Sequence, residues 1–139
     1  MENQNLKFDF VFLGQSVLKY QVPLDIFTTI NQIYEQNFHN LAPANGQLVG
    51  KIENEHSLFY HGADQTKMKN HNMLPRNVTD YFMTVFKHYL AFNKIKDYET
   101  HLNSIWVNEM KQHEYNPAHV HRGMLFTGLS SVMILKLPS

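Results

Sequence analysis

The sequence predicts an α+β fold in which helices pack on one side of an antiparallel sheet or jelly roll. Residues 24–38 and 78–92 carry apolar side chains at three- and four-residue spacing, the period of an amphipathic helix. The segments around them alternate or cluster aromatic and β-branched residues, as strands do. The order strand, helix, mixed region, helix and strands is typical of this class rather than of regular βαβ units.

The first 40 residues predict one strand region and one helix. Phenylalanines alternate with other residues over positions 8–12, and the pattern resumes at 17–20. We therefore expect a first strand or a bent hairpin there. The helix at 24–38 follows Pro23, which suits a first helical turn, and Asp25 lies where the helix dipole favours negative charge.

The second helix has a candidate start signal. Asn77, three residues before Asp80, resembles an N-cap followed by an acid, and Pro75 precedes it. We expect the helix to run from about 78 to 92.

Three later segments predict strands. Residues 57–60 are a possible short strand. Residues 105–110 alternate so that Trp106, Asn108 and Met110 share one face, where they either line a pocket or belong to the core. Residues 125–137 are dense in Val, Ile and Leu and predict one or two core strands.

Length and composition limit the range of functions. The chain of 139 residues fits a single domain, and 12 basic residues balance 12 acidic ones, which gives no indication of a nucleic-acid or membrane-surface partner. The absence of cysteine excludes disulfides and thiolate metal sites. No apolar stretch approaches the roughly 18 residues of a membrane span, and the polar N-terminus resembles no secretory signal. We expect a cytoplasmic protein.

His119 and His121 are the candidate metal ligands. Side chains alternate along extended chain, so the two imidazoles would project to one side and Val120 to the other. Pro117 excludes a helix at this point. Two imidazoles on one face form half of a metal site such as non-haem Fe(II) enzymes use. The alternative is a pair of ordinary loop histidines.

The last third of the chain resembles a known family. The strand Trp106-Val107-Asn108, the segment Glu114-Tyr115-Asn116-Pro117-Ala118-His119-Val120-His121 and the run from Leu129 to Pro138 occur in this order. Together they resemble phage and bacterial 2-oxoglutarate/Fe(II)-dependent oxygenases related to prolyl 4-hydroxylases. The similarity covers about residues 104–138, and the preceding part matches only as helical support.

The resemblance implies a double-stranded β-helix (jelly roll) that is incomplete, with the N-terminal helices packed on part of it. It also implies Fe(II) as cofactor, held by His119 and by His121 in the place where most relatives have aspartate. 2-Oxoglutarate would be the co-substrate, with Asn108 and Trp106 as cofactor-binding residues. Ile134 stands where relatives have a tyrosine.

The resemblance further implies that residues 1–139 are the N-terminal portion of such an oxygenase. The family's distal histidine and its 2-oxoglutarate-binding arginine come from later strands, so we expect a truncated chain that binds iron weakly and is inactive by itself. The substrate stays open between a peptide, an amino acid, a nucleobase and a sugar.

Two other functions stay open. The chain could be a non-catalytic jelly-roll or α+β module that forms a homo-oligomer through an exposed edge strand, its terminal one. It could also be a cupin-like metal protein that keeps both histidines and uses another oxidant. Dependence on 2-oxoglutarate separates these possibilities from the oxygenase.

Overall fold

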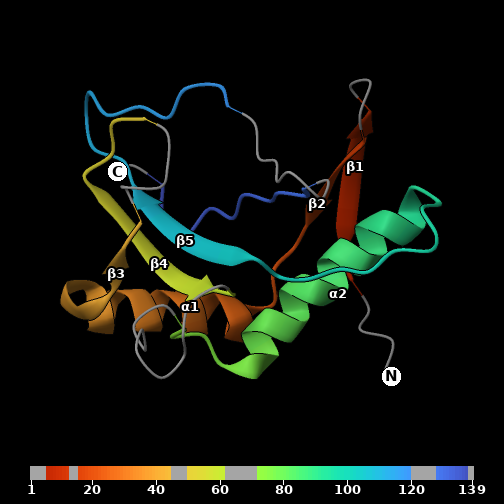
Figure 1. The fold of residues 1–139 in the computed structure, drawn as a ribbon, viewed down its shortest axis with the longest axis horizontal. Helices are drawn as coiled ribbons and strands as arrows, with labels where there is room; N and C mark the ends of the chain where they lie inside the picture. The colour runs from red at the N-terminus through yellow and green to blue at the C-terminus, as the bar shows by residue number, and fades with distance from the viewer. Residues whose placement is uncertain (1–5, 13–15, 45–49, 62–71, 120–127, 138–139) are drawn as a thin grey trace.

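The fold combines two α-helices with two antiparallel sheets, one of two strands and one of three. It is described by a computed structural model for residues 6–12, 16–44, 50–61, 72–119 and 128–137. Figure 1 shows both helices below the three-stranded sheet, with the two-stranded sheet to one side. The predicted α+β class is confirmed, and the described residues form no closed barrel.

Helix α1 (Leu24–Asn37) begins directly after Pro23 and continues into the short 3-10 helix η1 (Phe38–Asn40). Asp25 lies in its first turn, where the positive end of the helix dipole stabilises a carboxylate. Ile26 and Ile30, four residues apart, are its buried face. The helix predicted at 24–38 is therefore confirmed, with its last position in the 3-10 turn.

Helix α2 (Arg76–Phe92) starts two residues earlier than the predicted 78–92. Asn77 is not its N-cap, which corrects the sequence analysis. Pro75 holds that position with φ −70° and ψ 156°, and its carbonyl accepts hydrogen bonds from the Val78 and Thr79 amides. A proline fixes φ and lacks an N–H, so the helix can begin immediately after it.

Strands β1 (Phe8–Phe12) and β2 (Ser16–Tyr20) form an antiparallel hairpin, in register from Phe8 opposite Tyr20 to Phe12 opposite Ser16. Of the two predicted forms, the bent hairpin is the one observed. Its position beside α2 is visible in Figure 1.

Polar contacts hold this hairpin to the C-terminal half of α2. Tyr20 Oη lies 2.7 Å from His88 Nδ1, and Tyr89 Oη donates to the Ser16 carbonyl over 3.0 Å. Ser16 Oγ donates to Asn93 Oδ1. The hairpin is therefore attached to the helix through partners that lie 68–77 positions away in the sequence.

The three-stranded sheet has the order β3 (Ala42–Pro43), β4 (Asn54–Tyr60) and β5 (Ser104–Glu109). Strand β4 is longer than the predicted 57–60, and β3 was not predicted. Strand β5 confirms the predicted strand at 105–110 except at its end, because Met110 follows the strand and is 60% exposed. Met110 therefore lines no pocket and no core, which corrects the sequence analysis.

The core lies between the three-stranded sheet and the helices. Leu58 of β4 and Val78 of α2 are completely buried in it. Burial of apolar area on this scale is the main source of stability in a domain of this size. The buried residues of this cluster are Ile26, Ile30, Leu41, Leu58, Leu74, Val78, Tyr81 and Val85.

The predicted strand at 125–137 is not observed in its described part. Residues 128–137 are assigned to no helix or strand, while 125–127 lie outside the described residues. Met133 and Leu135 pack against the core, whereas Val132 is 88% and Ile134 is 60% exposed. The burial alternates as in a strand, but a strand also needs a hydrogen-bonded neighbour. Among the described strands β4 pairs with β3 and β5, and none pairs with this segment.

Candidate functional site

Glu55 and Ser57 of β4 lie opposite Asn108 and Trp106 of β5 in the antiparallel register. Directly opposite residues of an antiparallel pair project to the same face, so these four side chains share one face of the sheet. The intervening His56 lies on the other face, where its ring centroid is 4.7 Å from that of Phe38. The shared face is therefore the one that points away from α1 and η1.

This face buries polar groups without pairing all of them. Glu55 is 2% and Ser57 is 6% exposed. Within the described part of the chain, the buried oxygens Glu55 Oε1 and Asn108 Oδ1 have no hydrogen-bond partner. Because burial disfavours the carboxylate, and because Glu114 adds a like charge, the pKa of Glu55 is raised. A buried polar group without a partner costs about 1–3 kcal/mol, which makes this pair the strongest indication of a site.

A second segment folds back onto the start of β4. Lys51 and Tyr115 form an antiparallel bridge, in which the Lys51 amide donates to the Tyr115 carbonyl over 2.9 Å and the reverse bond measures 3.2 Å. Gly50, with φ +119°, allows this approach, since a Cβ atom there would lie 2.6 Å from the Tyr115 carbonyl oxygen. The bridge fixes the chain four residues before His119.

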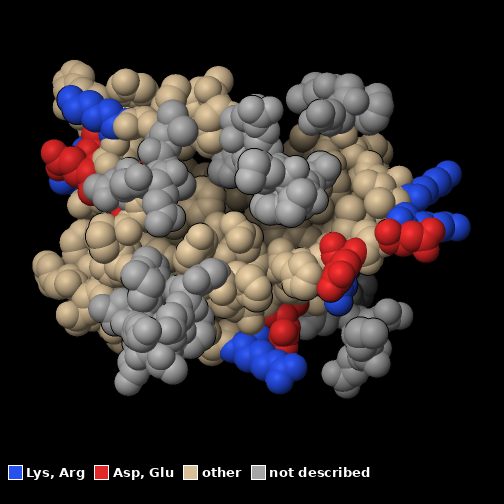
Figure 2. Space-filling model, in the orientation of Figure 1, with Lys and Arg blue, Asp and Glu red and all other residues tan. Residues whose placement is uncertain are grey.

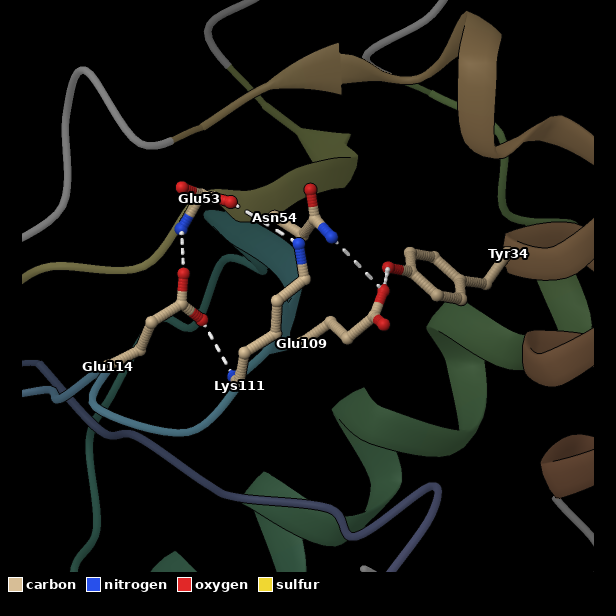
Figure 3. Close-up of polar contacts among 6 residues, drawn as sticks. All are labelled: Tyr34, Glu53, Asn54, Glu109, Lys111 and Glu114. Atoms are coloured by element: carbon tan, nitrogen blue, oxygen red, sulfur yellow. Dashed lines mark hydrogen bonds and ion pairs between the residues drawn. The ribbon is translucent and has the colours of Figure 1, made fainter.

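Glu114 anchors the same segment. Its Oε1 accepts a hydrogen bond from the Glu53 amide at 2.9 Å, and its Oε2 accepts one from the Lys111 amide at 2.7 Å (Figure 3). These two bonds, ahead of the nearby lysine charges, lower the pKa of Glu114. The Lys111 ammonium in turn contacts Glu53 Oε2 at 3.2 Å. The carboxylate thus ties the segment after β5 to the residue before β4.

His119 makes a tautomer-defining contact. Its Nδ1 lies 2.7 Å from the carbonyl oxygen of Pro117. A carbonyl only accepts, so Nδ1 carries the hydrogen and Nε2 holds the lone pair of the neutral ring. Metal-binding histidines commonly donate their second N–H in this way.

The remaining part of the predicted metal pair is not described. His121 and Val120 lie outside the described residues, so the common projection of the two imidazoles is neither confirmed nor contradicted. The described part of the chain contains no group of three or more His, Asp or Glu side chains arranged to hold a metal. Of the two predicted iron ligands, the described residues include only His119, whose Nε2 is the candidate donor atom.

Trp106 and Asn108, the predicted co-substrate-binding residues, do share a sheet face. Sequence reasoning missed Glu55 and Ser57 beside them. The alternation of β4 places residues 55 and 57 on one face, but the predicted strand begins at Ser57 and so leaves Glu55 outside it. A charged residue in a polar stretch gave no indication of burial.

The surface carries charges of both signs. On the face drawn in Figure 2, lysine, arginine and acidic side chains lie mainly around the periphery, in mixed groups. Exposed pairs such as Arg76–Asp80, at 3.5 Å, belong to this pattern. Such pairs contribute little to stability.

Comparison of the chain with protein-family models, with curated proteins and with solved structures gave no match. The resemblance of residues 104–138 to oxygenases therefore stays a prediction. Neither described helix has the length and apolar character that crossing a membrane requires.

Proposed function

We propose that the chain is part of a 2-oxoglutarate- and Fe(II)-dependent oxygenase of the hydroxylase type. The proposal is motivated by the three segments of residues 104–138 that resemble these oxygenases and occur in the same order as in that family. It includes an incomplete jelly-roll fold. The observation that carries it is the imidazole of His119, whose Nδ1–H···O=C contact with Pro117 gives Nε2 the lone pair that a metal requires.

In this proposal His119 and His121 hold the iron, and Asn108 and Trp106 contact 2-oxoglutarate. With O2 as the oxidant, iron bound there would couple the decarboxylation of 2-oxoglutarate to succinate and CO2 with the hydroxylation of a substrate. The carboxamide of Asn108 can donate to a carboxylate oxygen of 2-oxoglutarate. The Lys51–Tyr115 bridge and the Glu114 anchor restrict the His119 segment, and such restriction lowers the entropic cost of binding.

Calorimetry with Ni(II) tests the metal site in the 139-residue chain. We expect binding weaker than micromolar, since two imidazoles alone form an incomplete set of ligands. His119→Ala and His121→Ala should each weaken it further, and His39→Ala, an exposed histidine of η1, should not. Unchanged affinity in His119→Ala would contradict the proposal.

Succinate release tests the reaction in the natural full-length protein that contains these residues. Release that requires both Fe(II) and 2-oxoglutarate supports an oxygenase. Metal binding without any dependence on 2-oxoglutarate would instead favour the cupin-like protein.

A non-catalytic assembly module is the second candidate, and one observation favours it. Within residues 128–137, Val132 is 88%, Ile134 is 60% and Leu137 is 73% exposed. An extended apolar segment can pair with a second copy by strand addition. Light scattering that gives a dimer for the wild type and a monomer for Val132→Lys would support this function, and a wild-type monomer would exclude it.

A further inference from the structure

Glu55 and Asn108 present two acceptor oxygens on facing strands. They are direct partners in the β4–β5 register, where Cβ atoms lie roughly 4.5–5.5 Å apart. Glu55 is only 2% exposed. Neither Glu55 Oε1 nor Asn108 Oδ1 has a hydrogen-bond partner among the described residues. Each of these two buried acceptors therefore lacks a hydrogen from the described residues.

A proton on the glutamate supplies that hydrogen. A protonated carboxyl group gains one O–H donor and keeps an acceptor, while a carboxamide offers one acceptor and two N–H donors. We propose that protonated Glu55 donates to Asn108 Oδ1 and thereby positions the Asn108 carboxamide, whose N–H groups then face the co-substrate. Glu55 is in this sense a positioning residue, and the role rests on the proposed function.

The surrounding charges agree with a neutral Glu55. Burial comes first in raising its pKa, and Glu114, from the segment after β5, comes second. Its neighbours on the shared face, Asn108 and Trp106 of β5 and Ser57 of β4, carry no charge, and β3 consists of Ala42 and Pro43. A carboxylate at this position would also repel the two carboxylates of 2-oxoglutarate.

Two variants separate a hydrogen-bond donor from mere bulk. Glu55→Gln keeps the shape and a neutral N–H donor, whereas Glu55→Met removes the donor. In the natural full-length protein we expect Glu55→Gln to keep the wild-type KM for 2-oxoglutarate. Glu55→Met should raise KM by about tenfold or more with a smaller change in kcat. Glu35→Gln, an exposed glutamate of α1, serves as the control and should leave both constants unchanged.

The pH dependence of folding provides a readout without iron. In the unfolded chain Glu55 has the ordinary pKa of 4.5, and in the folded chain its pKa is higher. Between these two values the folded state binds one more proton, so stability falls as the pH rises. The unfolding constant of the wild type should increase relative to that of Glu55→Gln by up to about tenfold per pH unit in this window.

Carboxyl carbon NMR on the wild type decides the protonation directly, even if Glu55→Met does not fold. The Glu55 signal, assigned by its loss in Glu55→Gln, should titrate with a midpoint above 4.5. A midpoint at or below 4.5, or equal KM values for the Gln and Met variants, would overturn the inference and leave an active oxygenase intact. If the midpoint is raised but the protein does not turn over 2-oxoglutarate, the Glu55–Asn108 hydrogen bond is supported and the proposed oxygenase function is rejected.

Discussion

The phenol of Tyr34 on α1 donates a 3.2 Å hydrogen bond to Glu109 Oε2 at the end of β5. The Asn54 side chain of β4 donates to the same oxygen over 3.4 Å (Figure 3). Burial and the Glu109 charge raise the pKa of Tyr34, so the phenol keeps its proton at physiological pH. One carboxylate oxygen thus joins the first helix to both long strands of the sheet.

Removal of that hydroxyl should destabilise the fold modestly. We expect Tyr34→Phe to lower the free energy of unfolding by about 0.5–1 kcal/mol, because the bond is partly open to water. Urea denaturation measures the change. Tyr98→Phe, at an exposed tyrosine, is the control and should stay within about 0.5 kcal/mol of the wild type. An equal decrease in unfolding free energy in the two variants would show that the hydrogen bond from Tyr34 to Glu109 does not stabilise the fold.

Gly50→Ala should disturb the His119 segment. The positive φ of Gly50 disfavours alanine, and the added Cβ would meet the Tyr115 carbonyl oxygen. We expect a loss of about 1–3 kcal/mol in unfolding free energy, together with faster hydrogen exchange at the Lys51 and Tyr115 amides. Lys51→Ala keeps the backbone bridge and should show neither effect. Unchanged exchange in Gly50→Ala would contradict the close approach.

His56 should make the fold sensitive to mild acid. Its Nδ1 is buried without a partner in the described structure, and burial lowers its pKa although Glu109 acts in the opposite direction. Below the ordinary value of 6.5 the unfolded chain binds a proton that the folded chain does not. Stability is therefore complete above pH 6.5 and falls as the pH drops towards the lowered pKa.

Chemical denaturation as a function of pH measures this contribution. His56→Gln and His56→Phe should both flatten the acid limb of the profile, whatever their absolute stabilities. A limb as steep as that of the wild type in both variants would rule out His56 as its source.

The alternating burial of residues 132–136 predicts unequal costs of shortening their side chains to alanine. Leu135→Ala should lower the unfolding free energy by about 1–2 kcal/mol, because Leu135 packs against the core. Ile134→Ala removes a side chain that is 60% exposed and should cost less than about 0.5 kcal/mol. Thermal unfolding measures both losses of stability. A larger loss in Ile134→Ala than in Leu135→Ala would show that the orientation of the segment is wrong.

Local patterns in the sequence were sufficient for the helices and for much of the sheet. The four-residue spacing of Ile26 and Ile30 predicted the buried side of α1, and alternation placed Trp106 and Asn108 on one face of β5. Both features depend on the repeat of a single element, which the sequence displays directly.

Features that depend on contacts between distant segments were not predictable in the same way. Pro43 can form β3 only because β4 lies beside it, and the burial of Glu55 depends on what covers the sheet. Residues 128–137 have the composition of a strand, yet composition does not specify a hydrogen-bonded neighbour. The start of α2 was not predictable for another reason. Pro75 and Asn77 are both good helix-start signals, and only the structure shows that Pro75 is the N-cap.

The attachment of the hairpin to α2 has a consequence for the rate of folding. Ser16 meets Tyr89 across 73 positions and Asn93 across 77, so these contacts form only after a long loop has closed. Loop closure of this length is entropically costly and slows the folding of domains rich in non-local contacts. The hairpin and α1 can form early from neighbouring residues, but their assembly must wait for the synthesis of α2, and then of β5 in the last third of the chain.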